Sequence, residues 1–322
     1  MYSSKKYFST LINKFGNNEA LFDESGLRFK YSDIEILYKS KFFKALDRKL
    51  VLCKLSNDAE CIALYFALLA SGAIPMLVGS DISESEYLKL MNAYCPSAEL
   101  VPVDKHDNLS NQFTHKSIKG FTVKLIDSDF KYPIDNELAL LLPTSGSTGE
   151  QKFAKISYQN LKNNTKNISK YLKINSKDAT ITTLQPSYSY GMSILNTHID
   201  NAASIILTNF TIVQKKFWDI YNSNQITNFN GVPITYEILE KLGLEILNNK
   251  YLRFLTSAGG SINLDLIKKI ISYSEKRKID YYYMYGQTEA SPRIAYVKYP
   301  REKKYLGSIG RSIPEGKMYI LS

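Results

Sequence analysis

Short runs of apolar residues alternate along this chain with segments in which apolar residues recur every three to four positions. The first pattern is typical of buried strands and the second of amphipathic helices. Their alternation over most of the chain predicts an α/β protein of layered α/β subdomains with mostly parallel sheets. Strands are predicted at residues 49–55, 73–78, 137–143, 152–156, 179–184, 204–208, 225–230, 251–257 and 279–286. Helices are predicted at residues 35–46, 58–70, 158–172, 191–202, 214–224, 234–243 and 263–276, with Ser157 as the N-cap of the third.

One uncharged stretch, residues 61–80, is long enough to cross a lipid bilayer. The sequence "SGAIP" interrupts it, and Pro75 would break a helix at that point. We therefore predict a buried helix, a glycine turn and a buried strand rather than a membrane span. The N-terminal residues lack an apolar core followed by a small-residue cleavage site, so we expect a cytoplasmic protein.

Composition narrows the class of protein further. The chain has 322 residues, of which 44% are hydrophobic and 22% charged, and these fractions are typical of a folded globular protein. Its net charge of +10 comes from lysines scattered among Asn, Ile and Tyr, and the densest run, residues 298–304, is short. This scatter favours compositional bias over a basic face, so no nucleic-acid partner is expected. The three cysteines, at positions 53, 61 and 95, match neither a disulfide framework nor a metal site.

Four loops that follow predicted strands contain Gly or Pro. They read "PTSGSTG" (143–149), "NGVP" (230–233), "SAGGS" (257–261) and "YGQTE" (285–289). In open α/β sheets, ligands bind outside the carboxyl ends of the strands. We therefore expect these four loops to lie together on one edge of a sheet, around a ligand.

The first of these loops fits neither of two familiar phosphate-binding patterns. A Walker loop needs Gly before its Lys and Ser or Thr after it, whereas Gln151 precedes Lys152 and Phe153 follows it. A dinucleotide fingerprint opens onto a helix, and this loop opens onto a predicted strand. A nest of backbone N–H groups could still hold phosphate, since Gly146 and Gly149 permit the required backbone conformation. A polar surface hairpin without a ligand is the alternative that the loop alone leaves open.

Together with further motifs, the loop resembles the adenylate-forming superfamily, which includes acyl-CoA synthetases, luciferases and nonribosomal adenylation domains. The stretch "PTSGSTGEQK" is similar to the family loop TSGTTGxPKG, and residues 57–78 resemble its helix–strand AxxxAGAVxVPL. The stretches "SYSYGMS", "NGVP", "SAGGSI", "YGQTE" and "GSIGRSIPEG" follow in the family's order. The resemblance covers essentially the whole chain. It implies one N-terminal adenylation domain over residues 1–322, with two α/β subdomains of about 1–175 and 176–322.

The resemblance implies ATP and Mg²⁺ as cofactors and assigns roles to individual residues. Lys152 and the loop before it would hold the β- and γ-phosphates, and Tyr285 would stack on adenine. Thr288 would bond the α-phosphate, and Glu289 would ligate Mg²⁺. The implied catalytic residues are therefore Lys152, Thr288 and Glu289. The implied nucleotide-binding residues are Thr144, Ser145, Gly146, Ser147, Thr148, Gly149, Gly259, Gly260, Ser261, Tyr285, Gly286 and Gln287.

The carboxylate substrate would lie between two further stretches of the chain. The implied pocket residues are Tyr188, Tyr190, Gly191, Ser193, Gly231, Val232, Pro233 and Tyr236. Apolar and aromatic residues at helical spacing also occur in cores, so that interpretation stays open. The stretch 187–193 lacks the amine-binding aspartate of amino-acid adenylation domains, which favours a non-amino acid, although a small polar acid also fits. His198, inside a predicted helix, is expected to pack rather than to catalyse.

The resemblance implies ATP-dependent activation of a small carboxylic acid to an acyl-adenylate, as in the first half-reaction of an acyl-CoA synthetase. Family members continue into a small domain that carries a catalytic lysine, whereas the printed sequence ends at Ser322. We expect that domain to be absent, this chain alone to be weakly active, and coenzyme A or another acyl-acceptor partner to serve the full-length protein. The alternatives are a catalytically weak nucleotide- or acyl-binding module that acts with a partner, and an amino-acid-adenylating ligase.

Overall fold

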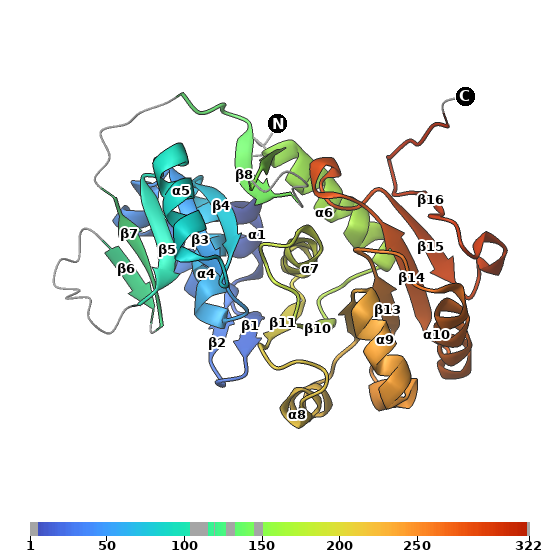
Figure 1. Cartoon of the computed structure of the whole chain (residues 1–322). Coiled ribbons are helices and arrows are strands. Elements are labelled where there is room, and N and C mark those ends of the chain that lie inside the picture. Colours follow the sequence, from blue (N-terminus) through green and yellow to red (C-terminus); the bar gives the residue numbers. More distant parts are fainter. Residues whose placement is uncertain (1–5, 104–114, 119, 127–132, 145–150, 321–322) are drawn as a thin grey trace.

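The computed structural model describes all residues except 1–5, 104–114, 119, 127–132, 145–150 and 321–322. Within this part of the chain the strands form two sheets, each covered by helices (Figure 1). The seven-stranded sheet has the order β6 (His115–Ile118), β7 (Phe121–Leu125), β5 (Ala98–Pro102), β3 (Leu50–Leu55), β4 (Ile74–Gly79), β8 (Leu138–Pro143) and β9 (Phe153–Ser157). The nine-stranded sheet has the order β16 (Arg311–Ser312), β15 (Ala295–Tyr299), β14 (Asp280–Tyr285), β13 (Phe254–Ser257), β12 (Asn228–Gly231), β10 (Ala179–Thr182), β11 (Ser204–Leu207), β1 (Glu19–Asp23) and β2 (Arg28–Lys30).

The helices alternate with the strands over most of the described chain, as the apolar periodicity predicts, although β5 to β9 follow one another without a helix. They are α1 (Tyr7–Phe15), α2 (Tyr31–Lys39), α3 (Lys41–Lys44), α4 (Ala59–Ser71), α5 (Glu84–Tyr94), α6 (Tyr158–Leu172), α7 (Ser189–Asp200), α8 (Lys215–Ser223), α9 (Pro233–Leu242) and α10 (Leu264–Arg277). The described residues also contain the short 3-10 helices η2 (Leu244–Leu247), η3 (Thr288–Ala290) and η4 (Lys303–Tyr305). The pairs β3–β4, β10–β11, β12–β13 and β13–β14 are all parallel. The predicted class, α/β with largely parallel sheets, is confirmed.

The uncharged stretch 61–80 divides as predicted into a helix, a turn and a strand. Gly72 ends α4 in the left-handed conformation, at φ 89°, and Pro75 lies inside the buried strand β4. In the described part of the chain, no helix combines the length and the apolar character that a membrane crossing requires.

The single helix predicted at 35–46 is wrong, because two helices occupy this region. Ser40 takes an extended conformation that ends α2, and its hydroxyl accepts a hydrogen bond from the backbone N–H of Phe43 in α3. A serine side chain can cap a new helix start in this way, and that local bond interrupts a continuous apolar period. The apolar pattern of residues 35–46 showed a helical period, but it did not show that Ser40 caps a new helix.

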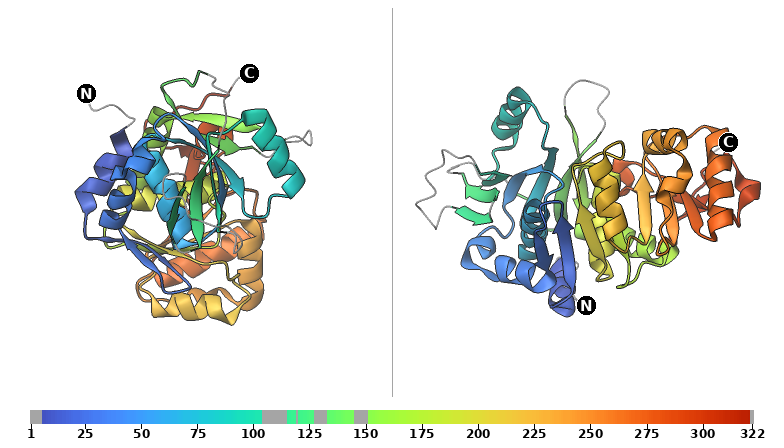
Figure 2. Two further views of the ribbon diagram at one scale, coloured as in Figure 1. Left: turned by 90° about the vertical axis from the view of Figure 1, so that its left-hand side faces the viewer. Right: turned by 90° about the horizontal axis from the view of Figure 1, so that it is seen from below.

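The two sheets do not follow the order of the chain completely. β1 and β2, from the N-terminal region, join the sheet formed by later strands, with Leu21 of β1 beside Ile205 of β11. Figure 2 shows this N-terminal hairpin, in blue, next to the later strands. The division into subdomains at about residue 175 stays a prediction, and the structure adds that an N-terminal hairpin links the two halves.

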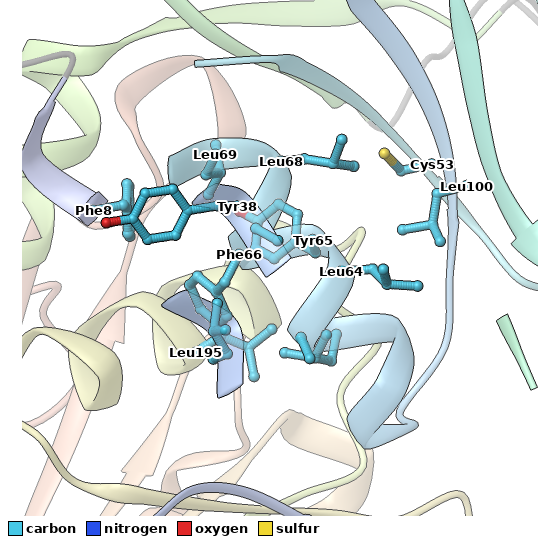
Figure 3. Close-up of a cluster of buried hydrophobic side chains, with 14 of the residues drawn as sticks. Phe8, Tyr38, Cys53, Leu64, Tyr65, Phe66, Leu68, Leu69, Leu100 and Leu195 are labelled. Carbon is cyan, nitrogen blue, oxygen red and sulfur yellow. The ribbon is translucent and has the colours of Figure 1, made fainter. Parts of the chain in front are cut away.

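Helix α4 forms the centre of the first core (Figure 3). All residues from 61 to 69 are fully buried, which explains why this helix has no polar face. The ring of Phe66 lies 5.9 Å from that of Phe8 in α1, and Figure 3 shows Leu195 of α7 beside it. The core thereby fixes α7, the helix with several predicted pocket residues, against the first sheet.

Candidate functional site

Three of the four special loops meet at one edge of the nine-stranded sheet. β12, β13 and β14 are parallel neighbours, so the loops after Gly231, Ser257 and Tyr285 lie at the same edge (Figure 1). The expectation of a single edge for all four is wrong, since β8 belongs to the other sheet. The base of the fourth loop is nevertheless near the third, because β9, the strand that follows the fourth loop, contacts η3 directly after β14. The two sheets together therefore build the site.

The base of the fourth loop is fixed by a β-hairpin. β8 and β9 are antiparallel, which confirms the predicted strand–loop–strand. The backbone N–H of Thr144 donates to the carbonyl oxygen of Lys152 at 2.9 Å, so these two residues face each other where the loop begins and ends. Both lie among the described residues, whereas Ser145, Gly146, Ser147, Thr148 and Gly149 lie outside them. The phosphate-binding role of these five stays a prediction.

The loops after β12 and β13 touch the start of α7. Gly259 has φ 91°, and a Cβ atom built on it would lie 2.2 Å from the hydroxyl oxygen of Tyr188 and 3.4 Å from Val232. A Cβ on Gly260 would lie 3.1 Å from the ring of Pro233. Only glycine satisfies both the backbone conformation and the contact at position 259. The residues assigned to adenine and those assigned to the acid are therefore direct neighbours.

The "YGQTE" loop presents an aromatic ring and then turns back sharply. Tyr285 is 41% exposed at the end of β14, so a planar ligand can stack on its ring. A Cβ atom on Gly286 would lie only 1.6 Å from the carbonyl oxygen of Pro292, and the N–H of Ile294 donates to the carbonyl of Tyr285 at 2.9 Å. The chain therefore folds back on itself here without room for any side chain at position 286.

The exposed carboxylate of Glu289 lines a groove between η3, α6 and β9. This groove has a volume of about 370 Å³ and is also lined by Lys155 and Ser291. Among the described residues, no group of three or more His, Cys, Asp or Glu side chains could hold a metal ion. A cation held by Glu289 would take its remaining ligands from phosphate oxygens and water, which is how Mg²⁺ commonly binds. The donor set fits Mg²⁺ bound together with a nucleotide.

Only part of the predicted acid pocket reaches the surface. Tyr188 is 38% exposed, whereas Tyr190, Ser193 and Tyr236 are buried. The hydroxyls of Tyr190 and Thr256 share a hydrogen bond at 2.6 Å, and Tyr236 donates to the Thr256 carbonyl at 2.8 Å. Tyr188 thus forms the exposed surface of the pocket wall, and the buried Tyr190 and Tyr236 support this wall from behind.

Arg293, which none of the sequence motifs singles out, is a buried arginine directly behind this wall. It is 3% exposed, donates to the hydroxyl of Ser193 at 2.8 Å and to that of Tyr171 at 3.2 Å. Its guanidinium carbon lies 4.5 Å from the centre of the Tyr190 ring. Among the described residues, no ion pair includes Arg293, and its Nε has no hydrogen-bond partner. The signal available in the sequence was a lone arginine in the otherwise apolar stretch "PRIAYV".

His198 packs inside α7, as expected. Its Nδ1 donates to the carbonyl of Ile194 at 2.8 Å, so its Nε2 accepts from the amide of Asn228 at 3.1 Å. Burial lowers the pKa of His198 to about 4. The imidazole is therefore neutral at physiological pH and has a structural role.

We expect His198 to make stability depend on pH. Because the ordinary pKa is near 6.5, the unfolded chain takes up a proton before the folded one does, so stability is complete above pH 6.5 and falls as pH decreases. From pH 7 to pH 4.5 this residue alone should lower the free energy of unfolding by about 2–3 kcal/mol. Urea unfolding of the wild type and of His198→Gln at both pH values measures this difference. Equal pH dependence in both proteins would contradict it.

A family model described as "AMP-binding enzyme" matches residues 45–322. Bacitracin synthase 3 of Bacillus licheniformis is 26% identical over 83% of this chain, and the mitochondrial medium-chain acyl-CoA ligase ACSF2 of Mus musculus is 27% identical over 56% of it. The chain spans 4% of the first relative and 30% of the second.

A solved structure has the same architecture. The complex of VinN with L-aspartate matches with a TM-score of 0.76, over 97% of this chain and 82% of that one. The sequences are 16% identical, so this match shows the fold alone.

Proposed function

Because the chain belongs to the family of AMP-binding enzymes, we propose that it activates a carboxylic acid with ATP, forming an acyl-adenylate and pyrophosphate. The observation that supports this most strongly is the meeting of three loops around Tyr188 and Tyr285, with the base of the fourth loop near them. They combine an exposed aromatic ring, glycines that admit close approach and the base of a polar hairpin. Each of these features suits one part of a nucleotide.

The proposed reaction is a displacement at the α-phosphorus of ATP. A carboxylate oxygen of the acid bonds to this phosphorus while the bond to the bridging oxygen of the β-phosphate breaks, and pyrophosphate leaves with that electron pair. In this proposal Tyr285 stacks on adenine, the backbone at Gly259 and Gly260 lies against its other face, and Thr288 bonds the α-phosphate. The protein contributes orientation and charge neutralisation rather than a covalent intermediate.

Lys152 is proposed to hold the leaving pyrophosphate, together with residues 144–149. Its backbone is fixed by the pairing with Thr144, so its flexible side chain starts from a defined backbone position at the loop's exit. Glu289 would hold Mg²⁺, which neutralises phosphate charge when bound. In this proposal Lys152 and the Mg²⁺ held by Glu289 both place positive charge beside the phosphate oxygens, where the leaving pyrophosphate takes up negative charge.

The surroundings of Arg293 favour an acid without an ammonium group. Its positive charge lies behind Tyr190 and would repel a cationic substrate, whereas it would attract a negatively charged one. An amino-acid-adenylating ligase remains the alternative, and bacitracin synthase 3 is among the similar proteins. For the whole protein we further propose a cytoplasmic location and transfer of the acyl group to a thiol such as that of coenzyme A.

The proposal is tested by acid-dependent exchange of labelled pyrophosphate into ATP, measured with panels of fatty, aromatic, dicarboxylic and amino acids. We expect exchange with at least one acid that lacks an amino group, and none without added acid. ATP binding without exchange for any acid would favour the catalytically weak binding module. Exchange with amino acids only would favour the adenylating alternative.

We expect Lys152→Ala to weaken binding of ATP with Mg²⁺ about tenfold, because one charge-assisted contact to phosphate is lost. Isothermal titration measures this change. Lys241→Ala, at an exposed position of α9, is the matched control and should leave the affinity unchanged. Unaltered affinity of Lys152→Ala would refute the assignment of this residue to the phosphates.

A further inference from the structure

A second groove, away from the candidate site, is lined by lysines. It has a volume of about 660 Å³ and lies between α1, α6 and the end of α7. Its lysines are Lys6, Lys14, Lys162, Lys166, Lys170 and Lys173. This gathering corrects the expectation that the lysines are merely scattered, because α1 and α6 are far apart in the sequence and both contact α7 (Figure 1).

The lysines form two rows. Lys162, Lys166 and Lys170 follow one another at intervals of four residues on α6, so they lie on one face and rise about 6 Å per step. Lys6 and Lys14, at the two ends of α1, border the groove from the other helix. The groove is therefore a channel about 12 Å long with positive charge on both sides.

The positive charge of this groove is poorly compensated. Among the described residues, no ion pair includes any of the six lysines. One carboxylate, that of Asp200, lines the groove, and it accepts hydrogen bonds from Tyr7 at 2.5 Å and Ser169 at 3.5 Å. Burial also raises the pKa of Asp200. An anionic group from outside would relieve the repulsion between the lysines.

The groove is distinct from the nucleotide site. α6 borders both this groove and the groove beside Glu289, but with different residues: Asn160, Asn163, Asn164 and Asn167 line the groove beside Glu289, whereas Lys162, Lys166 and Lys170 line this one. The two grooves share no lining residue. A ligand of this groove therefore does not occupy the place proposed for ATP or the acid.

We propose that this groove, which we call the lysine groove, binds an acidic amphipathic helix of a partner protein. Glutamates or aspartates at intervals of four residues on such a helix repeat every 6 Å, and this matches the spacing of Lys162, Lys166 and Lys170. Leu11 and Ile174 also line the groove and suit the apolar edge of the same helix. A concave channel does not suit a flat membrane surface, and Tyr7, the aromatic residue in its lining, is too buried for bases to stack on it.

The test uses a fluorescent helical peptide of about 18 residues with glutamate at every fourth position. Fluorescence anisotropy at several salt concentrations measures its affinity for the wild type and for the triple variant Lys162→Gln/Lys166→Gln/Lys170→Gln. We expect the triple variant to bind about tenfold more weakly and with a weaker salt dependence. The matched control is Lys241→Gln/Lys268→Gln/Lys276→Gln, which changes the net charge equally on α9 and α10 and should bind within about twofold of the wild type.

Equal losses in both triple variants would overturn the proposal, because net charge alone would then explain binding. Absence of peptide binding to the wild type would overturn it as well. The same holds if a single-stranded oligonucleotide or phosphatidylglycerol vesicles depend on the lysine groove more strongly than the peptide does. If the α6 variant unfolds, Lys6→Gln/Lys14→Gln on α1 replaces it, with an expected loss of about threefold.

Discussion

Substitution of Gly286 by alanine is expected to lower acid-dependent pyrophosphate exchange by at least about a hundredfold. The added Cβ atom would lie 1.6 Å from the carbonyl oxygen of Pro292. Because this oxygen belongs to the backbone and not to the end of a flexible side chain, it cannot move aside without a shift of the chain. Either Tyr285 and Thr288 must shift away from their positions or the turn must open. Both changes misplace groups proposed to contact adenine and the α-phosphate, and a displacement of about 1 Å is enough for a loss of this size.

Two further glycine substitutions serve as controls for Gly286→Ala. At Gly260 the new Cβ would lie 3.1 Å from the Pro233 ring, which is a tight but adjustable contact, so Gly260→Ala should lose far less activity. Gly120 has its nearest neighbour at 4.0 Å, and Gly120→Ala should behave like the wild type. Exchange rates and thermal unfolding of all three variants separate loss of the site from loss of the fold. Full activity of Gly286→Ala would show that the turn does not position the reacting groups.

The fold was predictable wherever local periodicity decides the structure. The amphipathic period of residues 263–276 and the apolar run at 137–143 identified α10 and β8 to within about two residues. The helix 35–46 failed because one serine hydroxyl caps a new helix, an interaction that leaves the apolar pattern unchanged. Local pattern also does not determine which sheet a strand joins. β1 pairs with β11 through contacts between residues about 180 positions apart, such as Leu21 and Ile205.

The candidate site also contains residues that local motifs identify and residues whose environment depends on distant parts of the chain. The short motifs identified Gly259 and Gly286, since close approach of the backbone requires glycine in any context. The environment of Arg293 could not be predicted, because its partners Tyr171, Ser193 and Met284 come from α6, α7 and β14, which are separate segments of the chain. The sequence shows an arginine, but only the packing shows that it is buried behind Tyr190 without an acidic partner.

Substitutions of Arg253 and Arg293 should have opposite effects if Arg293 serves the acid-binding site and Arg253 serves only the fold. Arg253 pairs with Asp178, whose side chain is 1% exposed, at 2.6 Å. Arg253→Met leaves that carboxylate buried and unpaired, so we expect a loss of stability of about 2 kcal/mol, less than for a fully buried pair because Arg253 is 40% exposed and screened by solvent. Its exchange activity per folded molecule should stay near that of the wild type, since its guanidinium donates to Asp178 and the Lys173 carbonyl and lies near the Phe254 ring, none of which is assigned to the nucleotide or the acid.

Arg293→Met should instead lower the activity and leave the stability nearly unchanged. The folded state no longer has to keep a charge in an apolar environment, and this gain offsets the lost hydrogen bonds to Ser193 and Tyr171, so stability should change by less than about 1 kcal/mol. The substrate loses the positive charge behind the pocket wall, so kcat/KM for the acid should fall about a hundredfold, mainly through KM. Urea unfolding and exchange kinetics at varied acid concentration measure the two effects. Arg293→Lys retains the charge and should recover part of the KM, whereas a purely structural arginine would show parallel losses of stability and activity and no such recovery.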